Sequence, residues 1–304
     1  MHGYFSGVEP CRIGIKACGP AHYWARELMR MGHGVVLMPP IYTKPYVKRG
    51  KNDAVDAAAI FEAMPRPGMR FVPVKSAESQ AALMLRKARG LLVKSQAMSV
   101  NALRANLAEF GIVAAKGIGR AGGLLERARQ DTGLFGAARA AVKILTAVLD
   151  GLASSIGELD KKIAEAHVQN ETSRLIEGIP GIGKLVASAL TAAAPDPGPF
   201  RSGRGFAAGL GLTPRQNSSG GKQTLGGITK QGNRRIRQLL VLSATPLLRH
   251  LPRRNGALAD WIVALLAGKP ARPVTVALAN KLARIVFAMM KTGEAFRNEL
   301  FAKA

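Results

Sequence analysis

Apolar side chains recur at alternating spacings of four and three residues within residues 138–167. The series consists of Leu145, Leu149, Leu152, Ile156, Leu159 and Ile163. On an α-helix this spacing puts every member on one stripe, which is the pattern of a coiled-coil seam. We therefore predict one long helix over residues 138–167. The stripe has two interpretations: it packs inside a helical bundle of the same chain, or it joins two protomers.

The segments before this helix differ in pattern. Residues 79–110 also have a helical pattern, and the glycine-rich segment Gly117–Gly123 is predicted to be a loop. Residues 11–75 instead alternate short apolar runs with helical stretches, which is typical of a parallel α/β sheet. The expected strands are 12–17, 34–38 and 71–74, and the expected helices are 23–31 and 53–63. The predicted fold class is α/β followed by all-α.

The last part of the chain opens on a pattern of two helices joined by a turn. Leu175–Ala189 has an apolar stretch, a Pro-Gly-Ile-Gly turn and a second stretch of small residues. This is the pattern of a helix-hairpin-helix, whose second helix presents backbone N–H groups to a phosphate. The predicted contacts are Gly181, Gly183 and Lys184, and the competing interpretation is a plain glycine-rich turn. A helix over residues 277–290 is expected to complete a mostly helical domain.

Positive charge dominates the chain, with 44 Lys and Arg against 19 Asp and Glu and a formal net charge of +25. No carboxylate lies between Asp196 and Asp260. A polyanion is therefore the natural partner. Aromatic residues make up only 5%, which disfavours stacking on single-stranded bases and favours duplex DNA or structured RNA. The candidate nucleic-acid contacts are Arg215, Lys222, Lys230, Arg234, Arg235 and Arg237.

Two carboxylates are candidates for metal binding. Asp53 and Asp56 lie three residues apart, so on a helix they share one face. Such a pair can hold a divalent ion that bridges phosphate oxygens. The alternative is a capping and dipole role at the start of a helix.

Two serines are candidates for nucleophilic catalysis. Ser218 and Ser219 precede a pair of glycines, so a bulky phosphodiester can approach their hydroxyls. Arg215, Lys222 and Arg234 would then stabilise the developing charge. The alternative is a flexible Ser-Ser-Gly-Gly loop with no chemistry.

The expected location of the protein is the cytoplasm. Its two cysteines, Cys11 and Cys18, cannot form a disulfide framework and do not have the spacing of a zinc site. We expect no apolar run long enough to span a membrane, no signal peptide and no membrane partner.

Five blocks of the sequence carry a resemblance to a known family, and they occur in the family's order. The blocks are Ala17–Leu28, Lys44–Ala57, Arg70–Lys75, Asn101–Gly111 and Pro214–Lys222. On these blocks the chain resembles the transposases of the IS110/IS1111 (IS116/IS110/IS902) family of insertion sequences. The resemblance covers nearly all of the chain after residue 12.

The resemblance implies an RNase H-like (RuvC-like) N-terminal domain with four acidic residues, Asp-Glu-Asp-Asp, that bind Mg²⁺. Asp53 and Asp56 match the last two acidic positions. The C-terminal domain of the family supplies a serine that becomes joined to DNA, and Ser219 matches it best, with Ser218 second. The implied partners are the DNA of the element ends and target, an element-encoded guide RNA, and further copies of the chain, from dimer to tetramer.

The resemblance also divides the chain into three domains. They are a truncated RNase H-like domain (1–78), a helical coiled-coil region (79–170), and a C-terminal transposase domain with the helix-hairpin-helix and the serine block (171–304).

Two departures from the family bear on its activity. Lys16 stands where the family has a metal-binding Glu, and the first acidic position has no counterpart. We therefore expect a truncated, mutated transposase that binds nucleic acid and is catalytically impaired, because an ammonium group and two carboxylates hold a hard cation poorly. Two alternatives stay open: a nucleic-acid-binding remnant without catalysis, and a junction-resolving nuclease that uses the carboxylates alone.

Overall fold

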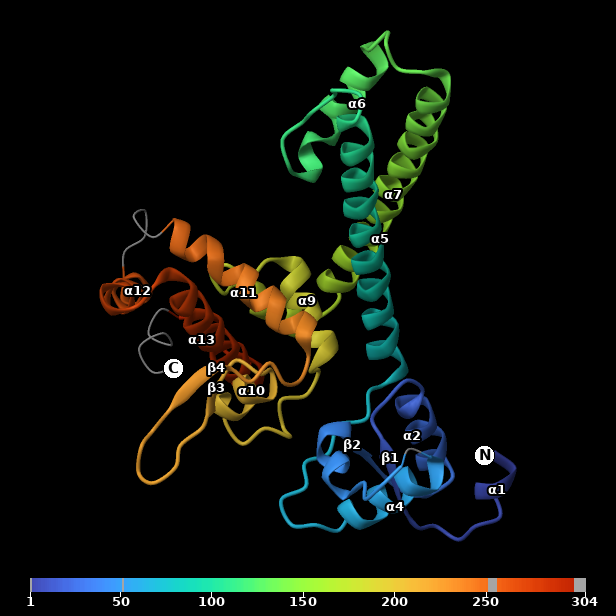
Figure 1. Cartoon of the computed structure of the whole chain (residues 1–304). Helices are drawn as coiled ribbons and strands as arrows, with labels where there is room; N and C mark the ends of the chain where they lie inside the picture. Colours follow the sequence, from blue (N-terminus) through green and yellow to red (C-terminus); the bar gives the residue numbers. More distant parts are fainter. Residues whose placement is uncertain (1, 51, 251–255, 298–304) are drawn as a thin grey trace. The chain divides into compact units, whose positions relative to one another are not determined.

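A computed structural model describes residues 2–50, 52–250 and 256–297. The chain forms two compact units, Met1–Ala81 and Ala82–Ala304, coloured along the sequence in Figure 1. The described residues are mostly helical, with two small sheets, which agrees with the predicted combination of α/β and helical structure. The RNase H-like and helix-hairpin-helix assignments, and domain boundaries at residues 78 and 170, stay predictions.

A parallel pair of strands forms the centre of the first unit. Strand β1 (Arg12–Lys16) pairs with β2 (Gly34–Met38) in register from the first residue to the last. Helix α2 (Ala21–Arg30) connects them, as parallel strands require a crossover. Ala25 of α2 and Leu37 of β2 are fully buried in a small apolar core.

Short elements complete the first unit. Val72, in the predicted strand 71–74, makes a single antiparallel bridge to Leu37 instead of a full strand. The helix predicted over residues 53–63 is present with those bounds. The remaining helices are α1 (His2–Phe5), α3 (Pro40–Thr43), the 3-10 helix η1 (Lys44–Tyr46) and α4 (Asp53–Ala63).

Two long helices, α5 (Ala77–Ala108) and α7 (Gly136–Val168), begin the second unit and run alongside each other (Figure 1). An ion pair between Arg89 of α5 and Asp160 of α7 links them. Near the other end of the pair, Leu149 is buried in an apolar cluster with side chains of α5. This part of the α7 stripe therefore packs within the chain, and a contact between protomers stays a prediction.

The loop predicted over Gly117–Gly123 is wrong from Ile118 onward. Residues Ile118–Arg120 form the 3-10 helix η2, and Gly122 and Gly123 lie in the first turn of α6 (Ala121–Gln130). Burial explains the difference, because Leu124 and Leu125 of α6 enter the same cluster as Leu149. Tertiary packing here outweighs the low helix propensity of glycine.

The largest apolar core lies in the C-terminal part of the second unit. Helix α13 contributes most to it, with nine buried apolar residues including Leu278, Leu282 and Val286. The helix begins before the predicted residue 277, directly after its N-cap Pro270, and Pro273 lies in the first turn, where proline is tolerated. The helices around this core are α8 (Glu171–Glu177), α9 (Lys184–Ala193), α10 (Gly203–Gly209), α11 (Arg234–Arg249), α12 (Ala257–Gly268) and α13 (Ala271–Thr292).

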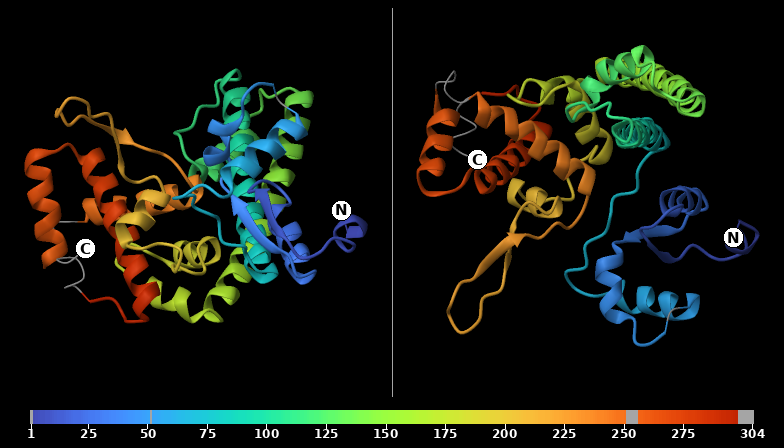
Figure 2. Two further views of the ribbon diagram at one scale, coloured as in Figure 1. Left: turned by 90° about the horizontal axis from the view of Figure 1, so that it is seen from below. Right: turned by 45° about the horizontal axis from the view of Figure 1, so that its top comes forward.

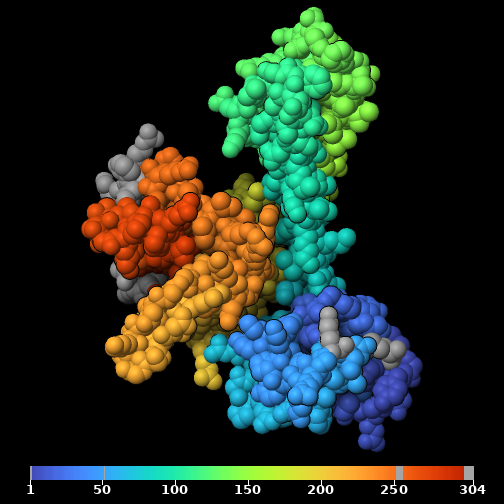
Figure 3. Space-filling view, in the orientation of Figure 1, coloured from blue at the N-terminus to red at the C-terminus, as the bar shows by residue number. Residues whose placement is uncertain are grey.

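An antiparallel hairpin projects from these helices. Its strands are β3 (Pro214–Gln216) and β4 (Leu225–Ile228). Figure 2 shows the β3–β4 hairpin extending away from α10 and α13 in both views. In Figure 3 the hairpin forms a separate lobe. The paired serines therefore lie in the outer part of a defined hairpin.

Two helices are long and apolar enough to cross a membrane by length and composition alone, contrary to the expectation from the sequence. They are α7 and α13. In α13, more than half of the residues in the most apolar 18-residue stretch are buried inside the unit, as expected for a core helix of a globular protein. Few residues in the corresponding stretch of α7 are buried. Helix α7 also carries charged residues, including Lys143 and Asp150.

Candidate functional site

The two candidate carboxylates lie in the first turn of α4. Asn52 caps this helix, and its side-chain oxygen accepts a hydrogen bond from the Val55 N–H at 2.8 Å. Because both Asp53 and Asp56 follow the cap within one turn, their negative charges also interact favourably with the positive end of the helix dipole. The side chain of Asp53 is exposed and that of Asp56 is half-buried.

Asp56 already has a cationic partner. The Lys16 ammonium, at the end of β1, donates a hydrogen bond to Asp56 Oδ2 at 2.5 Å. This hydrogen bond, followed by the attraction of the Asp56 charge and, more weakly, of Asp53, raises the pKa of Lys16 above its ordinary value. Lys16, at the end of β1, therefore supplies positive charge to the face that carries both carboxylates.

The described residues do not fit a divalent metal. No group of three or more His, Cys, Asp or Glu side chains within residues 2–50, 52–250 and 256–297 could hold an ion together. Mg²⁺ prefers near-octahedral oxygen ligation. An ammonium bound to one of only two carboxylates opposes a second cation at the same place.

The candidate serines lie at the tip of the hairpin. Lys222 N–H donates to the Ser219 carbonyl at 3.0 Å, and Gly220 and Gly221 have φ values of +55° and +76°. Two successive positive φ values are typical of a type I′ turn, which favours glycine. Both serines are exposed, but their hydroxyls differ. Ser218 Oγ accepts a hydrogen bond from the Thr224 N–H at 3.2 Å, whereas no hydrogen bond of Ser219 Oγ occurs among the described residues.

A tight backbone contact holds the base of the hairpin. A Cβ atom on Gly232 would lie 1.8 Å from the Gly209 carbonyl oxygen, and one on Gly211 would lie 2.4 Å from the Gln231 nitrogen. Both glycines also have positive φ. Only glycine fits such an approach, so the hairpin leaves the helices at a fixed place.

Arg237 differs from the other candidate cations. Only 8% of its surface is exposed, and its Nη1 donates to the carbonyls of Leu210 at 2.7 Å and Gln231 at 2.6 Å. Arg237 therefore holds the base of the hairpin and is turned away from solvent. The sequence contains a signal for this burial, because Arg237, Leu240, Ala244 and Leu247 share one helical face. The remaining candidates are exposed: Arg215, Lys222, Lys230, Arg234 and Arg235.

The turn between α8 and α9 carries the other predicted contacts. Gly181 has a φ of +85°, and a Cβ there would lie 2.6 Å from the Ser243 carbonyl oxygen, so this glycine is required for packing on α11. Gly183 is the N-cap of α9, and Lys184 is its first residue. Both are exposed, which leaves the N–H groups at the start of α9 open to an anion.

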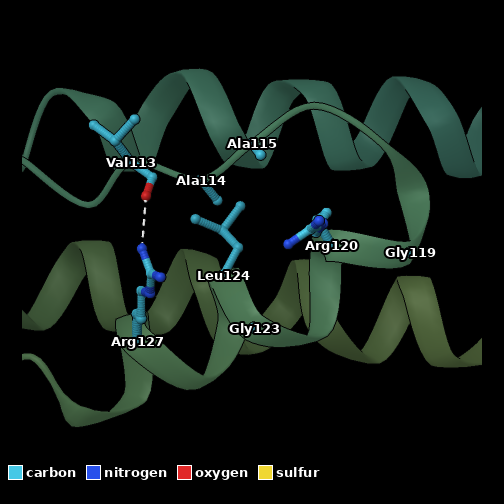
Figure 4. A pocket seen from close by; sticks show the side chains of 8 residues that line it. All are labelled: Val113, Ala114, Ala115, Gly119, Arg120, Gly123, Leu124 and Arg127. Carbon is cyan, nitrogen blue, oxygen red and sulfur yellow. Dashed lines mark hydrogen bonds between the residues drawn. The ribbon is translucent and has the colours of Figure 1, made fainter.

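A separate cavity of about 490 Å³ lies between η2, α6 and the segment before them (Figure 4). Arg127 Nη1 donates to the Val113 carbonyl at 2.9 Å across it. Leu124 and Arg120 also line it. None of the candidate site residues borders this cavity.

Comparisons with known proteins agree with the resemblance. Residues 173–258 match the family model described as Transposase IS116/IS110/IS902 family. A putative transposase of Sinorhizobium fredii is 46% identical over 98% of this chain and 77% of the relative. A probable family 20 transposase of Pseudomonas aeruginosa is 43% identical over 98% of this chain and 89% of the relative. The transposase for the element IS1111A of Coxiella burnetii is 37% identical over 97% and 82%.

The matched segment contains the turn before α9, the serine hairpin and the start of α11, and the relatives extend the similarity to nearly the whole chain. The chain therefore belongs to the IS116/IS110/IS902 family of insertion-sequence transposases.

Proposed function

We propose that this transposase binds the duplex DNA of element ends and target through its C-terminal unit, and that its strand cleavage is impaired. The observation that carries the proposed impairment is the ion pair between Lys16 and Asp56, and the proposed binding rests on exposed cations of the second unit. DNA binding and strand cleavage depend on different residues in this proposal, so the protein can lose cleavage and still bind DNA.

The proposed DNA contacts are cations and backbone N–H groups of the second unit. The hairpin supplies Arg215, Lys222 and Lys230, and the first turn of α11 supplies Arg234 and Arg235. The start of α9 adds Gly183 and Lys184. No Asp or Glu lies between residues 196 and 260 to compete for these cations, so phosphates are their natural counterions.

Ser219 is the proposed nucleophile of strand exchange. Its Oγ would attack a backbone phosphorus, form a phosphoserine ester and release one deoxyribose hydroxyl, while the serine proton passes to a base. Residues 211–230 contain no His, Asp or Glu, so the hairpin itself supplies no such base. Ser218 is the second candidate, but its Oγ already accepts a hydrogen bond.

The proposed impairment is electrostatic. Family members are expected to hold Mg²⁺ with four acidic residues, and this chain has Asp53 and Asp56 with a lysine at a third position. Because Lys16 neutralises Asp56, the remaining charge attracts a divalent ion poorly. The guide RNA and the homo-oligomer that the family implies belong to the same proposal.

The test measures binding and cleavage in parallel. Full-length protein is titrated into labelled duplex DNA and into a four-way junction, each with Mg²⁺, and both retardation and strand breaks are followed. We expect salt-sensitive binding without strand breaks. Protein that binds neither DNA would refute the proposal.

Three variants separate the alternatives if strand breaks appear. Cleavage lost in Ser219→Ala and retained in Ser218→Ala would make the protein a working serine transposase. Cleavage lost in Asp56→Asn but retained in Ser219→Ala would make it a junction-resolving nuclease. Either result contradicts the proposed impairment.

A further inference from the structure

An apolar side chain stands out on the basic hairpin. Leu225, the first residue of β4, is 64% exposed. Gly226 and Gly227 follow it, so no neighbouring side chain on the same strand covers it. A large aliphatic group in this position gains free energy when a partner removes it from water.

The register of the hairpin places Leu225 relative to its neighbours. Leu225 pairs with Gln216 on β3, so both side chains lie on one face of the ribbon. A Cβ atom on Gly226 would lie 3.9 Å from Arg215 Cβ, which puts Arg215 on the opposite face. One face therefore carries an apolar and an amide side chain, and the other carries a cation.

Charge identifies the partner that this ribbon fits. The segment between Asp196 and Asp260 has no carboxylate, which disfavours a cationic or apolar protein surface and favours a polyanion. A two-stranded ribbon is narrow enough to enter a groove of B-DNA. Glycines within a strand are also typical of places where another backbone approaches closely.

We propose that Leu225 is an apolar wedge that enters a base step of duplex DNA when the hairpin lies in a groove, and this inference rests on the proposed function. Partial unstacking by an inserted leucine kinks the duplex and brings more of its backbone onto the protein. Gln216, on the same face, is then placed to contact base edges, while Lys222 at the tip contacts phosphate.

The test uses full-length protein and short duplexes with 2-aminopurine at TA steps, which unstack easily. Fluorescence of 2-aminopurine rises when the base is unstacked. We expect a rise on binding wild-type protein, no rise with Leu225→Ala, and partial recovery with Leu225→Met. Leu225→Ala should weaken duplex affinity about 5- to 20-fold, since burial of a leucine is largely lost.

The matched control is Leu242→Ala, because Leu242 is 65% exposed on α11 and outside the proposed contacts. It should leave affinity and fluorescence unchanged. Thermal unfolding of each variant checks that it is folded.

Three results would overturn the wedge. Equal affinity and fluorescence for wild type and Leu225→Ala would reject it and leave DNA binding standing. Weaker binding by Leu225→Ala without any fluorescence rise in wild type would assign Leu225 to a groove contact without unstacking. Failure of wild type to bind the duplex at low salt would reject the proposed function and the wedge together.

Discussion

Lys16 has more influence on the expected chemistry than any other single residue. Its ammonium group, 2.5 Å from Asp56 Oδ2, converts a cluster of negative charge into an ion pair. The expectation from the sequence that an ammonium group faces the two carboxylates agrees with the contact between Lys16 and Asp56. It did not indicate which of the two aspartates the lysine would bind, since that depends on the packing of α4 on β1.

The Lys16–Asp56 pair predicts a pH-dependent stability. Because the pKa of Lys16 is raised in the folded protein, the pair stabilises fully below the ordinary lysine value of 10.5 and loses its effect as pH rises through the higher folded value. Wild type should therefore unfold at a higher temperature than Lys16→Met near neutral pH. The difference between the two proteins should shrink in alkaline solution. A difference that stays constant up to strongly alkaline pH would contradict the assignment.

Arg237 predicts a loss of stability rather than a loss of DNA contact. In Arg237→Met the carbonyls of Leu210 and Gln231 lose a charged donor while partly buried, at a cost of about 2–4 kcal/mol. Arg235→Met, at an exposed position two residues away, should change stability by less than about 0.5 kcal/mol. Urea unfolding of both variants measures this. Equal stability of the two variants would show that Arg237 does not hold the hairpin base.

Among the elements, the hairpin was the least predictable from sequence. The long helices and the strands at 12–17 and 34–38 follow from apolar periodicity. Residues 214–228 have no such alternation, because nearly all of their side chains are exposed. The glycine pair at its tip is a turn signal in the sequence, but the close backbone contacts at its base are not encoded in a local sequence pattern.

The base of the hairpin can be tested with two glycines. Gly232→Ala places a Cβ against the Gly209 carbonyl at positive φ, so we expect destabilisation by more than about 2 kcal/mol and weaker duplex binding. Gly227→Ala, in β4, has no neighbouring atom within 4 Å and should leave the stability of the folded protein nearly unchanged. Calorimetry and DNA titration measure both effects. A neutral Gly232→Ala would mean that the base of the hairpin adapts easily.

The stripe on α7 makes a second prediction at this scale. Leu149 is 6% exposed in the cluster shared with α5 and α6, so Leu149→Ala should destabilise the protein by about 2–3 kcal/mol. Val148, its neighbour on α7, is 45% exposed, and Val148→Ala should stay within about 0.5 kcal/mol. Denaturant titrations of the two variants and of wild type measure these differences in the free energy of unfolding. Comparable losses at both positions would indicate that the outer face of α7 is also covered, as an interface between protomers requires.

The charge of the whole molecule predicts how DNA binding depends on salt. If the six exposed candidate cations, Lys184 included, each meet a phosphate, the logarithm of the association constant should fall with the logarithm of salt concentration with a slope of about −5 to −6. Arg234→Gln should reduce the magnitude of that slope by about 0.9. Fluorescence anisotropy at several salt concentrations gives both slopes. An unchanged slope in Arg234→Gln would remove this residue from the DNA contact.

The most direct test of the central claim is a search for a covalent protein–DNA adduct. Purified wild-type protein is incubated with Mg²⁺, element-end DNA and the flanking transcript, then run on a denaturing gel beside Ser219→Ala. We predict no denaturant-resistant adduct in either sample, although wild type retards the DNA under native conditions. An adduct in wild type that disappears in Ser219→Ala would contradict the account, because strand cleavage would then tolerate Lys16 beside Asp56.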